Sequence, residues 1–220
     1  MDNIESQRKT PMMIGVLMAV SFPFLLLWSG PQFSNFLSYG YVKKLIIWVW
    51  LLLIYLYAVK VEKQSPLLWA DEKQPVRFYF ISVIAVLGLS FLAGALQQLL
   101  AKFGVKAPTS QVVHEMLAYM HAHPVLLVLT CVTAGVVEEL IFRGYLIPRL
   151  HILFKNSYLP VLFSALLFGA AHIGYGTVIN MLVPFLLGLI FGVYYQKYRN
   201  LKVLIFCHFF IDFLSLTLGK

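Results

Sequence analysis

The sequence predicts an all-α protein that crosses a membrane several times. Of its 220 residues, 60% are hydrophobic and 12% are charged, and the mean hydropathy is +0.83. Soluble domains carry roughly a quarter of their residues as charged side chains, so a water-exposed surface is excluded for most of this chain. The apolar runs are continuous rather than alternating, which argues against a membrane β-barrel. We therefore expect a polytopic transmembrane helical bundle of about seven spans.

Seven apolar runs approach the length of about 20 residues that a helix needs to cross a hydrocarbon layer of roughly 30 Å. The predicted spans are Pro11–Trp28, Lys44–Val59, Phe78–Leu100, Pro124–Leu146, Tyr158–Ile173, Val178–Tyr195 and Leu201–Leu218. Within Thr109–His121, apolar residues recur at helical spacing, which predicts a short helix at the membrane interface. No room is left for a separate soluble domain, so we expect one membrane domain over residues 1–220.

The net charge of +8 is interpreted as a sign of membrane topology and not of nucleic-acid binding. Lys and Arg collect in cytoplasmic loops because positively charged loops are translocated poorly. With seven spans, the loops on the side of the N-terminus hold 11 of these residues and the opposite loops hold 5. This asymmetry predicts a cytoplasmic N-terminus, whereas six spans with the first run lying flat would invert the orientation. Cys131 and Cys207 lie inside apolar runs, so neither a disulfide framework nor a cysteine-based zinc site is expected.

Ionisable residues within a span cost about 2.5–3.5 kcal/mol each on insertion scales and usually serve a function. Three predicted spans carry such residues: Glu138, Glu139, Arg143, His172, His208 and Asp212. Glu139 and Arg143 are four residues apart with the acid first, the favourable order for a helical ion pair. His208 and Asp212 have the same spacing, so Asp212 is expected to orient the imidazole or to stabilise its charge.

Glu138 and His172 have no such neighbour on their own predicted helices. Glu138 is rotated by about 100° from Glu139 and points elsewhere. In lipid, this carboxylate and this imidazole are most easily satisfied by each other, or by a shared water or metal ion. They reach a similar depth if the fourth helix continues beyond Arg143 and past Pro148. We therefore predict that Glu138 and His172 converge.

The pattern Glu-Glu-x-x-x-Arg, then Phe-x-x-x-His, then His-x-x-x-Asn/Asp, each in its own span, resembles the CPBP family of intramembrane proteases. This family includes CAAX proteases and bacteriocin-processing enzymes and is also called the Abi family. The matching residues are Glu138, Glu139, Arg143, Phe168, His172, His208 and Asp212. The resemblance implies a peptidase whose catalytic core lies within residues 124–218, while residues 1–107 match only in being apolar.

The resemblance also implies a role for each residue of the pattern. Glu138 and His172 would activate a water molecule for attack on a peptide carbonyl, and Glu139 and Arg143 would hold the site together. His208 and Asp212 would stabilise the oxyanion. An ionised Asp212 has no proton to donate. It must therefore be protonated or act by keeping His208 cationic, and we favour the second role.

The sequence is compatible with a metal-dependent and with a metal-free mechanism. Glu138, His172 and His208 are three ligands of the kind that zinc accepts, with water as the fourth. The chain has no H-E-x-x-H motif, and a metal-free mechanism is preferred over a divalent metal such as zinc. The expected partners are the lipid bilayer and a peptide or protein substrate within or at the membrane, with no nucleic acid. The expected location is a bacterial cytoplasmic membrane.

Two other functions are compatible with these residues. An ion- or proton-coupled transporter would use Glu138, His172, His208 and Asp212 as an intramembrane relay. The repeated broken helices typical of many transporters are not evident in the sequence. A non-catalytic member of the family would act as a membrane scaffold.

Two features of the sequence predict packing and not chemistry. Phe168 lies one helical turn before His172, so its ring is expected to pack against the imidazole. Gly188 and Gly192 form a small-xxx-small pair, which is typical of helices that approach closely.

Overall fold

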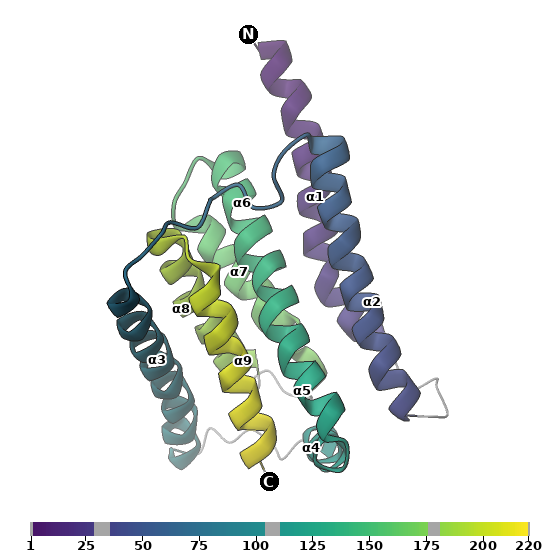
Figure 1. Ribbon diagram of the computed structural model, residues 1–220, viewed down its shortest axis with the longest axis vertical. Helices are drawn as coiled ribbons and strands as arrows, with labels where there is room; N and C mark the ends of the chain where they lie inside the picture. The colour runs from purple at the N-terminus through teal and green to yellow at the C-terminus, as the bar shows by residue number, and fades with distance from the viewer. Residues whose placement is uncertain (1, 29–35, 104–110, 176–180, 220) are drawn as a thin grey trace.

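The computed structural model describes residues 2–28, 36–103, 111–175 and 181–219, and the regular secondary structure in these ranges is entirely helical. Helices α1 (Asp2–Trp28) and α2 (Phe36–Tyr57) lie side by side at one edge of the bundle, and α3 (Val76–Lys102) lies at the opposite edge (Figure 1). Helix α4 (Gln111–Ala122) runs across one end of the bundle. The all-helical prediction is confirmed.

The elements between these edges carry the polar residues of the pattern. They are α5 (Pro124–Thr133), the π-helix η2 (Ala134–Leu146), α6 (Ile147–Phe154), α7 (Leu159–Ala170), the short η3 (Ile173–Tyr175), α8 (Leu182–Tyr198) and α9 (Leu201–Leu218). Helix α1 begins at one end of the bundle and α9 ends at the other (Figure 1). This is the arrangement that an odd number of crossings requires.

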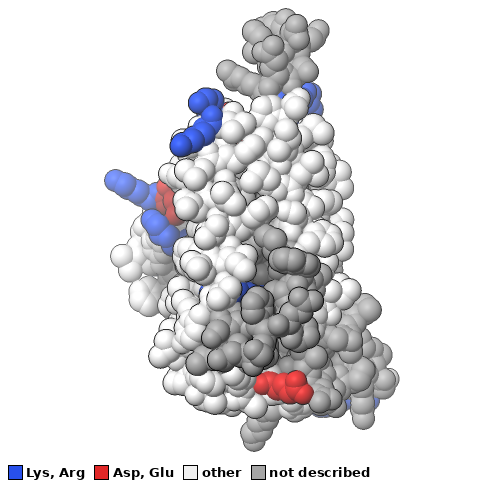
Figure 2. All heavy atoms as spheres, turned by 90° about the vertical axis from the view of Figure 1, so that its right-hand side faces the viewer, with Lys and Arg blue, Asp and Glu red and all other residues white. Residues whose placement is uncertain are grey.

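Four described segments are long and apolar enough to cross a membrane, which makes the chain a multi-pass membrane protein. They are Gly40–Glu62, Val76–Leu100, Pro124–Phe154 and Leu201–Leu218. They correspond to the second, third, fourth and seventh predicted spans, and crossing by the other three stays a prediction. On the described part of the α1–α2 face, uncharged side chains predominate, with Lys or Arg in the upper part and Asp or Glu near the lower edge (Figure 2). The predicted starts at Val178 and Thr109 lie outside the described residues.

The fourth predicted helix is the longest segment of the bundle. It runs without a break over the 31 residues Pro124–Phe154, and its middle part, η2, is π-helical. Pro124 is the first residue of the segment, a position at which the backbone N–H has no partner within the helix, so a proline costs no hydrogen bond there. Pro148 lies in the first turn of α6, where the π-helical stretch returns to α-helix. The continuation past Pro148, on which the predicted depth of Glu138 depends, is confirmed.

Close helix packing fixes the elements around the polar residues. A core cluster that includes Phe22, Ile54 and Phe142 joins α1 and α2 to η2. Helices α7 and α8 approach so closely that a Cβ at Gly188 would lie 2.8 Å from the Cα of Ala165. The close approach predicted from this glycine pair is confirmed.

A buried polar network joins the N-terminal helices to α6. One of its members, Arg149, is among the 11 cations assigned to loops on the N-terminal side, and the structure corrects that assignment. Arg149 is fully buried, and its Nη2 lies 2.6 Å from Glu62 Oε2. Arg149 also donates to the carbonyl oxygens of Ser65 and Pro66, and the Tyr145 hydroxyl donates to Glu62 Oε1. The positive charge on the N-terminal side therefore includes a neutralised arginine, and the orientation stays a prediction.

Candidate active site

Glu139 is the centre of a buried polar cluster between η2 and α9. Its Oε1 accepts a hydrogen bond from Arg143 Nη1 at 2.7 Å and lies 2.8 Å from His208 Nδ1. Glu139 and Arg143 are fully buried, and His208 is 5% exposed. The predicted Glu139–Arg143 pair is confirmed. The link from Glu139 to His208 was not predicted, because these residues are 69 positions apart on different helices.

The second nitrogen of His208 faces two further carboxylates. Nε2 lies 3.6 Å from Asp212 Oδ2, which confirms the predicted neighbour, and 4.0 Å from Glu138 Oε2. Side-chain exposure rises from 0% at Glu139 to 15% at Glu138 and 30% at Asp212. The cluster is therefore closed at Glu139 and opens on the side of Asp212.

The ring of Phe168 holds the two histidines and the arginine together. Its centroid lies 5.1 Å from that of His172 and 5.7 Å from that of His208. The guanidinium carbon of Arg143 lies 4.4 Å from the same centroid, a cation–π distance. The predicted packing of Phe168 on His172 is confirmed. Its contacts with the other two groups, and the contact of Phe191 with His208 at 5.9 Å, were missed because aromatic residues are abundant throughout this sequence.

Glu138 and His172 border the same cluster from different elements. Glu138 lies against His208, whereas His172, just after α7, has its Nδ1 2.8 Å from the Phe168 carbonyl oxygen. The charge of Asp212 acts on His172 as well as on His208. Convergence of Glu138 and His172 on one water molecule stays a prediction.

The donor set does not form a metal centre in this arrangement. Among the described residues, no three His, Cys, Asp or Glu side chains are grouped so that they could hold a metal ion. The contacts of His208 Nδ1 with Glu139 and of His172 Nδ1 with a carbonyl oxygen leave both Nε2 atoms available as ligands. It is the spacing of the three side chains that does not suit a zinc ion. The set Glu138, His172 and His208 thus lacks the geometry of a zinc site, and no step below uses a metal.

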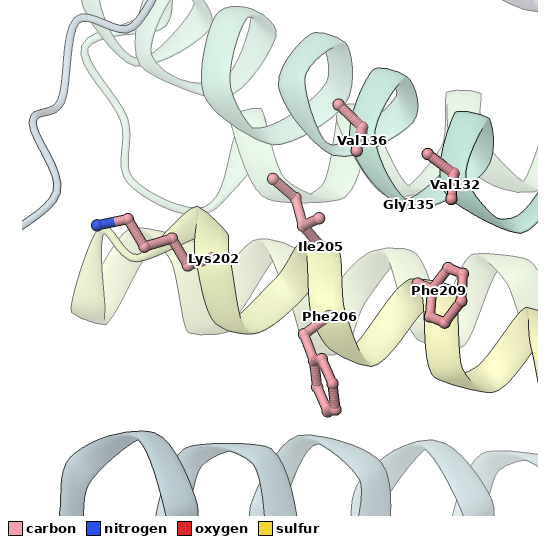
Figure 3. Close-up of a pocket in the computed structure, with 7 residues that line it drawn as sticks. All are labelled: Val132, Gly135, Val136, Lys202, Ile205, Phe206 and Phe209. Atoms are coloured by element: carbon pink, nitrogen blue, oxygen red, sulfur yellow. The ribbon is translucent and has the colours of Figure 1, made fainter. Parts of the chain in front are cut away.

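An apolar groove lies beside the polar cluster but does not contain it. It has a volume of about 350 Å³ and runs between the α5–η2 segment and α9 (Figure 3). The lining residues are Val132, Gly135, Val136, Lys202, Ile205, Phe206 and Phe209. None of the six ionisable residues of the pattern lines it, so it is not the candidate active site.

Comparison with known families decides what kind of domain carries this cluster. Residues 120–214 match the family model described as type II CAAX prenyl endopeptidase Rce1-like. This stretch is an Rce1-like domain. The match contains the whole Glu-Glu-x-x-x-Arg, Phe-x-x-x-His and His-x-x-x-Asp pattern, so the resemblance to CPBP proteases is confirmed and the domain is of a protease family. No curated protein and no solved structure matches the chain significantly.

The Rce1-like domain does not include every charged residue near the cluster. Lys44 of α2 lies outside residues 120–214, yet its charge acts on Glu138 and Asp212. In the predicted topology, Lys44 lies at the edge of the second span and is one of the five cations on the side opposite the N-terminus. The signal in the sequence is helical spacing: Lys44 is three residues before Ile47 and ten before Ile54, which are buried on the inward face of α2.

Proposed function

We propose that this protein is an intramembrane endopeptidase that hydrolyses a peptide bond of a membrane-associated peptide or protein, including lipidated ones. The observation that carries the proposal is the setting of His208. Its imidazole is fixed by Glu139 on one nitrogen and faces Glu138 and Asp212 with the other, inside an Rce1-like domain. A buried imidazole surrounded by three carboxylates is energetically unfavourable in a membrane, and such groups are usually retained for a function. Hydrolysis is a function that would use all of them.

In this proposal, Glu138 is the general base. Its carboxylate takes a proton from a water molecule, and the water oxygen forms a bond to the carbonyl carbon of the substrate. The tetrahedral intermediate then collapses, the C–N bond breaks, and Glu138 returns the proton to the leaving amine. His172 orients the water from the side of α7. The products are a new carboxyl group and a new amine.

His208 is the oxyanion donor in this mechanism. Because Glu139 accepts from Nδ1–H, a proton on Nε2 makes the ring an imidazolium that presents its second N–H toward the space between Glu138 and Asp212. Asp212 stabilises this cationic form, and Arg143 neutralises Glu139. A fixed donor aimed at the developing negative charge is the usual largest contribution to acyl-transfer catalysis.

The membrane arrangement that we propose has seven crossings in a single domain over residues 1–220, with a cytoplasmic N-terminus in a bacterial plasma membrane. Helices α1 and α2 then close the side of η2 that faces away from α9, and α3 covers α8 and α9. The bilayer excludes water elsewhere, so the hydrolytic water is confined to this polar cluster.

The proposal is tested with the purified full chain in liposomes that carry no ion gradient. Membrane peptides with and without a prenyl group are added, and fragments are identified by mass spectrometry. We expect cleavage by the wild type, loss of cleavage in Glu138→Gln and His172→Ala, and no effect of a chelator. A parallel set of liposomes carries an imposed ion gradient, and ion flux that follows this gradient, with no fragments in either set, would instead establish the transporter. An intact cellular phenotype in both variants would establish the scaffold.

A further inference from the structure

Helix α2 turns one stripe of side chains toward the bundle, and this stripe carries a lysine. Its members recur every three or four residues: Gly40, Lys44, Ile47, Leu51, Ile54 and Ala58. Ile47, Ile54 and Ala58 are buried in the core cluster that also contains Val137 of η2. Lys44 therefore occupies an inward position near the start of the apolar segment Gly40–Glu62.

Contacts one turn before and one turn after Lys44 show which element it faces. A Cβ at Gly40 would lie 2.7 Å from Leu126 Cδ2 of α5. Trp48 Nε1 donates to Thr133 Oγ1, at the end of α5, at 3.2 Å. Lys44 lies between these two contacts, so its side chain faces α5. Helix α5 continues directly into η2, which carries Glu138 and Glu139.

The ammonium of Lys44 acts on the site without being neutralised by it. Glu138 and Asp212 are the carboxylates whose charges reach it. The buried ion pairs of the described residues join Glu139 with Arg143, Glu62 with Arg149, and His208 with its three neighbouring carboxylates, and none of them includes Lys44. A lysine near the end of a span can extend to the membrane surface, but Lys44 is on the face of α2 that packs against α5. Ionisable residues that face the interior of a bundle usually serve binding or transport.

We propose that Lys44 binds a carboxylate of the peptide substrate at the mouth of the hydrolytic site. The inference rests on the proposed function. Asp212 is the most exposed carboxylate of the cluster, and Lys44 acts on it, so Lys44 lies on the side where the site opens. Glu138 and Asp212 repel an anion that moves deeper, and the ammonium holds it at the mouth. The residue comes from a helix outside the Rce1-like domain.

The substrate carboxylate can be the chain end or an acidic side chain, so the test uses three sets of short apolar peptides. The first has a free C-terminal carboxylate and no Asp or Glu, the second is the same set amidated, and the third is amidated with one Glu. Binding to the full chain in lipid nanodiscs is measured by equilibrium dialysis, and cleavage is followed in parallel. The variants are Lys44→Met, Lys44→Arg and, as a matched control, Lys60→Met, which removes an exposed lysine from the far end of the same span.

The wild type should bind the free-acid set roughly tenfold more tightly than the amidated set, which corresponds to one well-formed charge interaction. Lys44→Met should lose this preference with amide binding unchanged, Lys44→Arg should keep it, and Lys60→Met should behave as the wild type. Tight binding of the third set as well would extend recognition to acidic side chains.

Equal binding of acid and amide by the wild type would overturn the inference, as would a Lys44→Met effect that is the same for all three sets. Failure of the proposed function gives a different result. Acid binding that depends on Lys44 but leads to no cleavage contradicts the peptidase and supports the carboxylate site. Cleavage without any acid preference contradicts Lys44 binding alone.

Discussion

Arg143 and Glu139 show at the scale of single residues why charge can be buried in this bundle. Both side chains are fully buried, they pair at 2.7 Å, and Arg143 also lies on the rings of Phe168 and Phe191. The pair shares Glu139 with His208, so the structural ion pair and the candidate catalytic imidazole depend on one carboxylate. Damage to either partner should therefore affect both stability and chemistry.

Arg143→Met should destabilise the protein by about 3–5 kcal/mol, because it leaves the Glu139 carboxylate buried with less compensating charge. Arg143→Lys keeps the charge but loses the planar fork and part of the stacking, so it should fall between Met and the wild type. Unfolding in detergent, followed by circular dichroism with increasing denaturant, measures the difference. Unchanged stability of Arg143→Met would show that Glu139 does not need this partner.

The contact between η2 and α9 is the element that sets the geometry of the site. A Cβ at Gly135 would lie 2.9 Å from the Ile205 carbonyl oxygen and 3.1 Å from the Phe209 backbone nitrogen. Both are backbone atoms, so the helices must separate to accept any larger residue. Gly135 lies one turn before Glu139, and His208 lies next to Phe209. Separation at this point should therefore lengthen the Glu139–His208 contact.

Gly135→Ala should cost about 1–3 kcal/mol through overpacking and should also lower peptidase activity. The matched control is Gly88→Ala on α3, where a Cβ would meet no atom within 4 Å. That variant should be neutral or slightly stabilised, since Ala is better than Gly in a helix interior by about 0.5–1 kcal/mol. Thermal unfolding and peptide cleavage of the two variants are compared. Equal behaviour of both would refute the close contact.

The sequence predicts contacts along one helix much better than contacts between helices. Glu139–Arg143 and His208–Asp212 follow from a spacing of four residues, which places side chains on one face whatever the rest of the fold does. The Glu139–His208 hydrogen bond depends on how η2 and α9 pack, and no local pattern encodes that. The π-helical form of η2 was also not predicted, because nothing in the residue pattern of Ala134–Leu146 marks a change from α-helical to π-helical hydrogen bonding.

At the scale of the whole molecule, the Glu62–Arg149–Tyr145 network joins the N-terminal helices to the Rce1-like domain. Arg149 is stacked on the Tyr145 ring, with its guanidinium carbon 3.6 Å from the centroid. Glu62 belongs to the segment that continues α2, which also carries Lys44. The network therefore holds in place the helix that carries Lys44, the residue that we propose to bind the substrate carboxylate. The sequence did not predict it, because Arg149 resembles an ordinary loop cation.

Arg149→Met and Glu62→Gln should each destabilise the protein by about 3–5 kcal/mol, because each leaves a buried charge without its partner. The double variant should cost less than the sum of the two single variants, since the two groups interact directly. A double-mutant cycle measured by denaturant unfolding gives this coupling energy. Additive effects would contradict a direct, buried ion pair.

The most direct test of the central claim is peptide cleavage in heavy-oxygen water by the purified wild type and by Glu138→Gln. Glu138 is 15% exposed and its nearest ion-pair contact is 4.0 Å long, so this variant should fold normally. We predict that the wild type releases fragments with one heavy oxygen in the new carboxyl group, and that Glu138→Gln is slower by about 10²–10⁴-fold. Equal cleavage by both proteins, or no cleavage by the wild type, would contradict the account.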